Sequence, residues 1–245
     1  MDKRIRVQRR GRGSSTFTAS THKRVAPAKY PSVSITDKKG VVNGQVKGII
    51  HDPGRGSPMV AVRLETGDTY YSVVPEGVYE GQPTQIGDDA SVDIGNVLPI
   101  GKIPEGTMVC NIEMSPGDGG KMVRASGAYA TIISHTTEKT IVKLPSRQNK
   151  QVNNLCRATV GVIAGAGRTE KPFLKAGTKH HLMRAKGHVY PRTRGIAMIA
   201  ACHPYGSSKK GGRKVTTVSR NAPPGKKVGL IAARSAGSRI KRRRV

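Results

Sequence analysis

The sequence predicts an all-β protein in which two small barrels carry long basic arms. Between residues 44 and 163, short runs alternate apolar and polar residues, and turns rich in glycine or proline separate them. The 245 residues contain no Trp, two Phe and seven Tyr, too few large side chains for one extended core. Small barrels built on Val, Ile, Ala and Gly are therefore expected.

Three strand-like runs come first along the chain. GQVKGIIHD, Gly44–Asp52, ends at a Pro-Gly turn. MVAVRLETGDTYYSVV, Met59–Val74, contains two alternating runs on either side of Thr66-Gly67-Asp68, the pattern of a hairpin. ASVDIGNVL, Ala90–Leu98, is expected to form another short strand. Together these runs predict the first barrel.

A second group of strand-like runs follows at close spacing. PIGKIPEGT, Pro99–Thr107, has two prolines and two glycines and is the expected boundary between the two barrels. The expected strands after it are Thr107–Met114, Ala128–His135, Thr140–Pro145, Lys150–Asn154 and Arg157–Ile163. Each barrel then has about 60 residues, a size at which a domain is only marginally stable alone.

The positive charge lies at the two ends of the chain. Of the formal net charge of +28, residues 1–30 carry +8 and residues 165–245 carry +20, whereas residues 31–164 are balanced. This charge distribution is typical of a protein that binds a polyanion such as RNA. Binding is favoured because each phosphate that the protein neutralises releases a counterion. The arms lack a sustained helical or strand period, so we expect them to be irregular, and disordered without a polyanion.

The final basic run, RIKRRR from Arg239 to Arg244, could also be a localisation signal or a solvated tail. That alternative explains one short run. It does not explain an arm of 81 residues, 165–245, with apolar islands such as Gly195–Ala201 and Val228–Ala233, which need something to pack against.

The segment GSSKKGGRK, from Gly206 to Lys214, resembles a phosphate-binding loop only superficially. Gly211 follows Gly206 at the required spacing, but Gly212-Arg213 stands where Lys-Ser or Lys-Thr is needed. No apolar strand precedes the segment and no helical pattern follows it. A nucleotide-binding loop is therefore not predicted.

The cysteines and histidines do not form a catalytic or metal-binding pattern. Cys202 and His203 are adjacent, and Glu170 is the only acid in the C-terminal arm that could orient the imidazole. Cys110, Cys156 and Cys202 are far apart, which indicates neither a disulfide framework nor a zinc ribbon and fits a reducing cytosol. No run of 18 apolar residues exists. We expect no cofactor and no metal.

Two glycine-flanked turns place basic residues where they could reach RNA. Arg55 lies in HDPGRGSP, His51–Pro58, directly after an expected strand. Lys121 and Arg124 lie in GDGGKMVRASGAYA, Gly117–Ala130, whose glycines allow close backbone approach. Each could be an ordinary exposed side chain, but beside two basic arms the pattern favours contact with RNA.

These motifs together resemble a known family. IHDPGRGSP, IGNVLPIGKIPEGT, SPGDGGKMVRASGAYA, CRATVGVIAGAGR, KPFLKAG, RTRGIAM and HPYG occur in the order found in the universal large-subunit ribosomal protein L-two family. The resemblance covers nearly the whole chain. The form HDPGRG is similar to the archaeal and eukaryotic branch.

The resemblance implies an OB-like barrel followed by an SH3-like barrel, with extensions that thread into large-subunit rRNA. The expected division is residues 1–35 for the basic N-terminal extension, 36–98 for the OB-like barrel, 99–164 for the SH3-like barrel and 165–245 for the C-terminal extension. The rRNA-binding residues it implies, together with those argued above, are Arg55, Lys121, Arg124, Arg157, Arg192, Arg194, His203, Lys209, Lys210, Arg213 and Lys214.

The resemblance further implies a structural role in the large subunit, close to the peptidyl transferase centre, where His203 is expected to lie. The partners would be large-subunit rRNA and neighbouring ribosomal proteins, with the chain monomeric in a cytoplasmic ribosome and no membrane contact. Pro204 restricts His203 to an extended conformation, so its ring is expected to project outward. The alternative is an enzyme acting on RNA or nucleotides through the His203 loop, but no paired acids are evident in the neutral middle.

Overall fold

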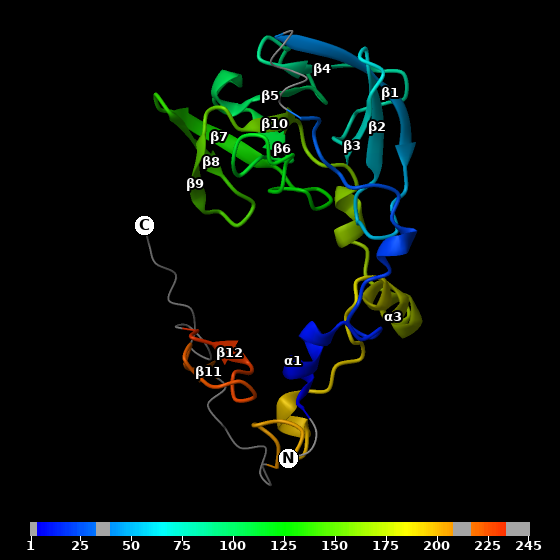
Figure 1. Ribbon diagram of the computed structural model, residues 1–245, viewed down its shortest axis with the longest axis vertical. Helices are drawn as coiled ribbons and strands as arrows, with labels where there is room; N and C mark the ends of the chain where they lie inside the picture. Colours follow the sequence, from blue (N-terminus) through cyan, green and yellow to red (C-terminus); the bar gives the residue numbers. More distant parts are fainter. Residues whose placement is uncertain (1–3, 33–39, 208–216, 234–245) are drawn as a thin grey trace. The chain divides into compact units, whose positions relative to one another are not determined.

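The computed structural model describes residues 4–32, 40–207 and 217–233, and it divides into two compact units (Figure 1). Thr21–Phe173 form the barrel unit, and Met1–Ser20 with Leu174–Val245 form the extension unit. The strands are β1 Val41–Ile50, β2 Met59–Leu64, β3 Thr69–Val73, β4 Pro83–Gly87, β5 Val97–Pro99, β6 Met108–Cys110, β7 Ala130–His135, β8 Lys139–Lys143, β9 Asn149–Asn153, β10 Arg157–Val160, β11 Thr217–Val218 and β12 Leu230–Ile231. The α-helices are α1 Arg6–Arg9 and α3 Ala176–Ala185. The short 3-10 turns are Arg10–Arg12, Thr21–Lys23, Ile100–Lys102, Ala166–Thr169 and Gly195–Ala197.

Ten strands of the barrel unit form one continuous sheet in the order β3-β2-β1-β4-β5-β10-β6-β7-β8-β9. Neighbouring strands pair antiparallel, apart from β4 and β5, which meet in parallel at Ile86 and Val97. β10 pairs with both β5 and β6, so a strand from the end of the barrel unit closes onto its middle. The predicted all-β fold class is confirmed.

Two separate hydrophobic cores lie on opposite sides of β5. Val97 packs with the first core, which includes Val42, Val62 and Ile86, whereas its neighbour Leu98 packs with the second. Successive side chains of a strand point to opposite faces, so one short strand supplies both cores. The second core is built mainly from Ile100, Ile103, Val109, Ile112, Ile132, Val142, Val152 and Ala158.

The hairpin expected in Met59–Val74 is confirmed as β2 and β3, with Gly67 at a φ of 90° in the turn. The strand expected at Ala90–Leu98 is wrong over most of its length, because only its last two residues belong to β5. β4 was not expected, since Pro83 begins it and Ile86 is its only large apolar residue. Proline is tolerated at the first position of a strand, where no ladder hydrogen bond is lost.

The extension unit contains a helix that the sequence pattern did not predict. α3 ends at Ala185, and Gly187, the second residue after it, has a φ of 67°. The Gly187 N–H donates to the Arg184 carbonyl at 3.0 Å, and the His188 N–H donates to the Met183 carbonyl at 2.8 Å. This pair of bonds is the Schellman motif, in which glycine is favoured. The expectation of a wholly irregular C-terminal arm is therefore corrected.

A small core joins the two ends of the chain within the extension unit. Ile5, Tyr205 and Val228 are buried together, and the Tyr205 hydroxyl donates to the Val228 carbonyl at 3.0 Å. Because Ile5 is far from the other two in sequence, this contact gives the arms a packed centre that their low apolar content did not suggest. No helix in the described residues is long and apolar enough to cross a membrane.

Candidate nucleic-acid interface

The turn after β1 holds Arg55 through a buried carboxylate. Asp52 is fully buried, and its Oδ2 accepts a hydrogen bond from Arg55 Nε at 2.7 Å. Its Oδ1 accepts from the Gly54 N–H at 3.2 Å, and Arg55 Nη2 points to the Ala26 carbonyl at 3.5 Å. About a quarter of the Arg55 side chain stays exposed, so the guanidinium is fixed in place but still reachable.

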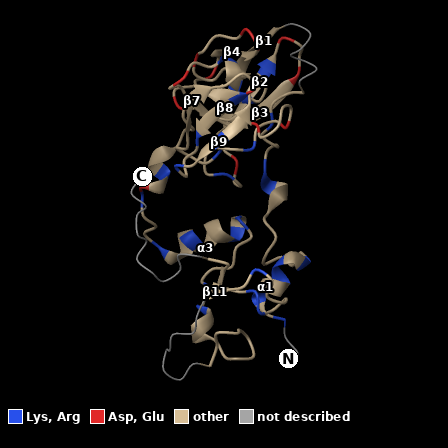
Figure 2. Cartoon of the chain, turned by 90° about the vertical axis from the view of Figure 1, so that its left-hand side faces the viewer, with Lys and Arg blue, Asp and Glu red and all other residues tan. Residues whose placement is uncertain are grey.

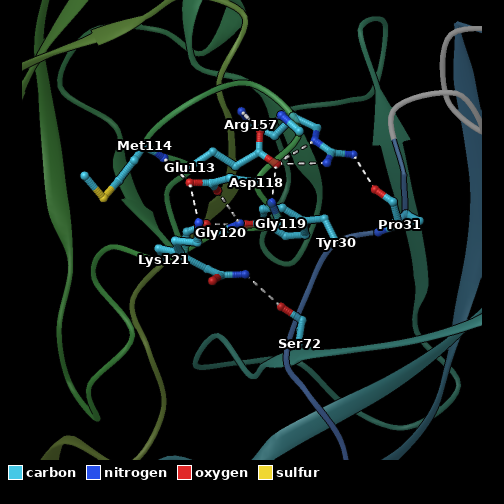
Figure 3. Close-up of polar contacts among 12 residues, drawn as sticks. Tyr30, Pro31, Ser72, Glu113, Met114, Asp118, Gly119, Gly120, Lys121 and Arg157 are labelled. Atoms are coloured by element: carbon cyan, nitrogen blue, oxygen red, sulfur yellow. Dashed lines mark hydrogen bonds and ion pairs between the residues drawn. The ribbon is translucent and has the colours of Figure 1, made fainter.

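The glycine-rich loop between residues 115 and 124 is held by a second buried carboxylate, Glu113 (Figure 3). Glu113 Oε2 accepts from the Gly117 N–H at 3.3 Å, and Oε1 accepts from the Gly119 N–H at 2.9 Å. Both glycines have a φ above 80°, in the left-handed region that disfavours other residues. The loop is therefore fixed to the barrel at its glycines.

Asp118 stiffens the tip of the same loop and orients Lys121 (Figure 3). Burial raises the pKa of Asp118, but N–H groups of Met114 and Gly120 and the charge of Lys121 outweigh it and lower the pKa overall. Lys121 Nζ lies 3.6 Å from Asp118 Oδ2, and more than half of its side chain is exposed. Lys121 can therefore reach an anion outside the protein.

Arg124 lies close to Arg55 although the two are far apart in sequence. Its Nη1 donates to the Gly120 carbonyl at 3.0 Å and its Nη2 to the Ala28 carbonyl at 2.8 Å. Burial, and then the positive charge of Arg55, lower the pKa of Arg124. The group remains charged at neutral pH, because a guanidinium does not lose its proton in proteins. Two like charges are thus held together.

Two further arginines join this group, and sequence reasoning missed both. The side chain of Arg24 packs over Gly54 and that of Arg168 over Gly56, so closely that a Cβ on either glycine would collide with it. Arg168 donates to Ser126 Oγ from Nε at 3.2 Å and from Nη2 at 2.8 Å. We refer to Arg24, Arg55, Arg124 and Arg168 as the arginine cluster. The glycines beside Arg55 were the available signal, since they leave room for a second layer of side chains.

Arg157 does not belong to this surface. It is 5% exposed, and its Nη2 and Nε lie 2.8 and 3.2 Å from Glu113 Oε1. Its Nη1 donates to the Pro31 carbonyl at 2.9 Å, and its guanidinium lies over the Tyr30 ring, 5.4 Å from the centroid (Figure 3). The guanidinium faces the interior, so the structure gives Arg157 a supporting role in place of the expected outward contact.

In the extension unit, basic residues surround a recess beside His203. The recess has a volume of about 880 Å³, and Arg192, Arg194 and His203 line it together with Arg6, Arg9 and Arg10. None of the described residues of this unit is Asp or Glu. Figure 2 shows the same contrast: acidic residues lie over the strands and loops of the barrel unit, whereas α1 and α3 carry Lys and Arg.

The ring of His203 packs inward, in contrast to the expected outward projection. One face lies against Gly195, where a Cβ would collide with it, and Tyr205 lies 5.0 Å away between ring centroids. The Tyr205 N–H donates to His203 Nδ1 at 3.1 Å, which requires an unprotonated Nδ1. Burial, and then the charge of Arg192, lower the pKa of His203 from its ordinary value. The ring is neutral at pH 7 and keeps an Nε2–H donor.

Four of the expected contacts, Lys209, Lys210, Arg213 and Lys214, lie outside the described residues. Within the described part, no group of three or more His, Cys, Asp or Glu side chains could hold a metal ion. His180 and His181 meet edge to face, 5.6 Å apart between ring centroids. Cys110 and Cys156 are buried, Cys202 is exposed, and all three thiols are free.

Comparison with known proteins gives matches along almost the whole chain. The family model described as Ribosomal Proteins L2, RNA binding N-terminal domain matches residues 1–85, and Ribosomal Proteins L2, C-terminal domain matches residues 93–227. The large ribosomal subunit protein uL2 of Korarchaeum cryptofilum is 52% identical over 244 residues, covering 99% of this chain and 98% of the relative. The uL2 proteins of Methanocaldococcus jannaschii and Hyperthermus butylicus are 53% and 52% identical, covering 98% of this chain and 100% and 99% of their own lengths.

Proposed function

The chain belongs to the ribosomal protein L2 family, and from this premise we propose that it is a structural constituent of the large ribosomal subunit that binds the rRNA of that subunit. The resemblance to the archaeal-type branch agrees with its relatives from Korarchaeum and Methanocaldococcus. The proposed location is the ribosome in the cytoplasm, with the chain present as a monomer among neighbouring ribosomal proteins.

The observation that carries this function is the arginine cluster. Four guanidinium groups gather around one turn, and among the described residues the carboxylate of Asp52, the acid within that turn, forms an ion pair with Arg55 and with none of the other three. None of the ion pairs among the described residues involves Arg24, Arg124 or Arg168. Such a group repels itself in the free protein, and closely spaced phosphates of folded RNA would relieve the repulsion.

The extension unit supports the same function in a different way. Its described residues include Lys and Arg but no Asp or Glu, and glycines allow close packing there, Gly195 against the His203 ring and Gly206 against the backbone of Ile199. We infer that Arg192, Arg194 and the cations from Lys209 to Lys214 neutralise phosphates where RNA is densely packed. On the family resemblance, His203 would lie near the peptidyl transferase centre and donate one hydrogen bond from Nε2.

Selective binding to large-subunit rRNA tests the proposed function. Full-length chain is bound to transcribed large-subunit rRNA, and unlabelled large- or small-subunit rRNA is added as competitor at several salt concentrations. We expect large-subunit rRNA to compete more strongly, and the affinity to fall linearly with salt on a logarithmic scale. Equal competition by the two RNAs would show that the protein binds RNA only as a non-specific polycation, and would contradict the proposed function.

A second prediction concerns His203, for which we propose no catalytic role. With one nitrogen engaged by Tyr205 and no acid among the described residues of its unit, the imidazole has no partner for proton relay. Large subunits assembled with His203→Gln are expected to transfer peptides at near-normal chemical rates, with any defect confined to assembly. His203→Gln keeps a side-chain N–H donor, and Gly195→Ala, which displaces the ring, is the matched control for assembly. A loss of several orders of magnitude in intact particles, with the pH dependence of a lost base, would contradict this role.

A further inference from the structure

One recess of the barrel unit is not explained by the arginine cluster. It has a volume of about 510 Å³ and lies between the segment Gly127–Thr131 and the end of β8 with the turn that follows it. Its volume falls within the range of about 300–1,000 Å³ that is typical of small-ligand sites. Along the chain it begins one residue after Ser126, which holds Arg168 of the arginine cluster. The recess is therefore close to the proposed RNA surface.

The walls of the recess are fixed by backbone hydrogen bonds. The Gly127 N–H donates to the Ile163 carbonyl at 2.9 Å, and the Ile163 N–H donates to the Ala128 carbonyl at 3.1 Å. The two walls are joined where Lys143 of β8 pairs directly with Thr131 of β7. A site built on paired strands needs little ordering when it binds a ligand, so its shape is available in advance.

Arg147 stands in the turn at a position that favours glycine. The Arg147 N–H donates to the Leu144 carbonyl at 2.8 Å, and the Leu144 N–H donates to the Gln148 carbonyl at 3.0 Å. These bonds make a tight hairpin turn between β8 and β9, in which Arg147 has a φ of 63°. Left-handed backbone is strained for a residue with a Cβ, and glycine is the usual occupant of such a turn position. An arginine kept under strain at the edge of a recess points to a use for its side chain.

The side chains around the recess suit a nucleotide. Tyr129 lines the recess and is 46% exposed, so its aromatic ring is accessible from outside the protein. Lys143 and Arg147 are exposed, and neither takes part in an ion pair among the described residues. An aromatic ring with adjacent cations is the combination that proteins use to stack an unpaired base and hold its phosphate.

We propose that this recess takes one unstacked nucleotide of the large-subunit rRNA, with its base against Tyr129 and its phosphate bound by Lys143 and Arg147. The inference rests on the proposed rRNA binding and adds a contact that recognises an unpaired base. RNA is favoured over an acidic peptide because a peptide carboxylate would use the two cations but not the exposed aromatic ring.

The variant Arg147→Gly separates RNA binding from a purely structural role of Arg147, because the stability of the fold and the affinity for RNA should change in opposite directions. Relief of the left-handed strain should raise the urea midpoint of the full-length chain, while binding to transcribed large-subunit rRNA weakens. The slope of log affinity against log salt should fall in magnitude by about 0.7–0.9, the value for one lost phosphate contact. A lower urea midpoint would contradict the strain, and unchanged RNA affinity and slope would overturn the proposal.

Tyr129 supplies the second arm of the test. Tyr129→Ala should weaken rRNA binding by about 5- to 150-fold, the range for one stacked base, whereas Tyr129→Phe should keep most of the affinity. Equal losses in both variants would contradict stacking. If both bind rRNA normally but fail to retain a neighbouring protein during assembly, the recess is a protein contact and the proposal is wrong. Loss of RNA binding on replacing Arg55 and Arg124, with no effect at Tyr129 or Arg147, would reject this inference while leaving the proposed function intact.

Discussion

Glu113→Ala is expected to destabilise the barrel unit by about 3–5 kcal/mol, the cost of removing one partner of a buried ion pair. The variant would leave the guanidinium of Arg157 buried without its carboxylate, and the N–H groups of Gly117 and Gly119 without their acceptor. The measurement is urea unfolding of the full-length chain, followed by circular dichroism and tyrosine fluorescence, since the chain has no Trp.

An exposed ion pair provides the matched control for Glu113. Asp89 Oδ1 lies 3.2 Å from Lys102 Nζ, and three quarters of the Asp89 side chain is exposed. Asp89→Ala should cost about 0–1 kcal/mol, because water screens the pair. The double variant Glu113→Leu with Arg157→Met should recover part of the loss, since no uncompensated charge remains buried. A cost for Glu113→Ala no larger than that for Asp89→Ala would show that the buried pair does not hold the loop.

Short apolar runs bounded by turn residues predicted the strands whose side chains pack on a core. Ala128–His135 contains β7, in which Ala130 and Ile132 are buried on one face. Met59–Val74 became β2 and β3, and β2 is buried on both faces apart from Arg63. Thr107–Met114 gave only the short strand β6, since Asn111 turns the chain with a φ of 48°. Sequence reasoning missed α3 because none of its residues is buried, so its sequence has no apolar stripe with the period of a helix. The one local sign of its end was Gly187.

The part of the candidate site that lies within a single turn could be predicted from the sequence. Glycines on both sides of Arg55 indicated a turn that presents a cation, and the buried Asp52 in that turn holds it. The buried position of Arg157 was not predicted, because its partner, Glu113, is 44 residues away in sequence. Arg24 and Arg168 likewise reach the turn only through the tertiary fold. A motif thus identifies a cation, but long-range packing decides whether it faces RNA or the interior.

The second large effect is expected for joint replacement of Arg55 and Arg124 by alanine. Each single variant should weaken binding to large-subunit rRNA by about 1–3 kcal/mol, the range for a well-placed arginine contact. The double variant should lose more than either single variant but less than their sum. The reason is that the charge of Arg55 already disfavours that of Arg124 in the free protein, and each single variant removes this repulsion.

The control removes the same charge from another part of the barrel unit. Lys47 and Arg63 are exposed on β1 and β2, so alanine at both positions lowers the net charge equally without touching the arginine cluster. Comparing the two double variants therefore separates loss of the cluster from a general loss of positive charge.

The most direct measurement is filter binding of full-length chain to transcribed large-subunit rRNA across a range of salt concentrations. We expect the Arg55 and Arg124 double variant to lose affinity and its salt slope to fall in magnitude by about 0.7–0.9 for each lost contact, while the Lys47 and Arg63 variant stays close to wild type. Wild-type affinity and slope in the Arg55 and Arg124 variant, or an equal loss in the control, would contradict rRNA binding by the arginine cluster.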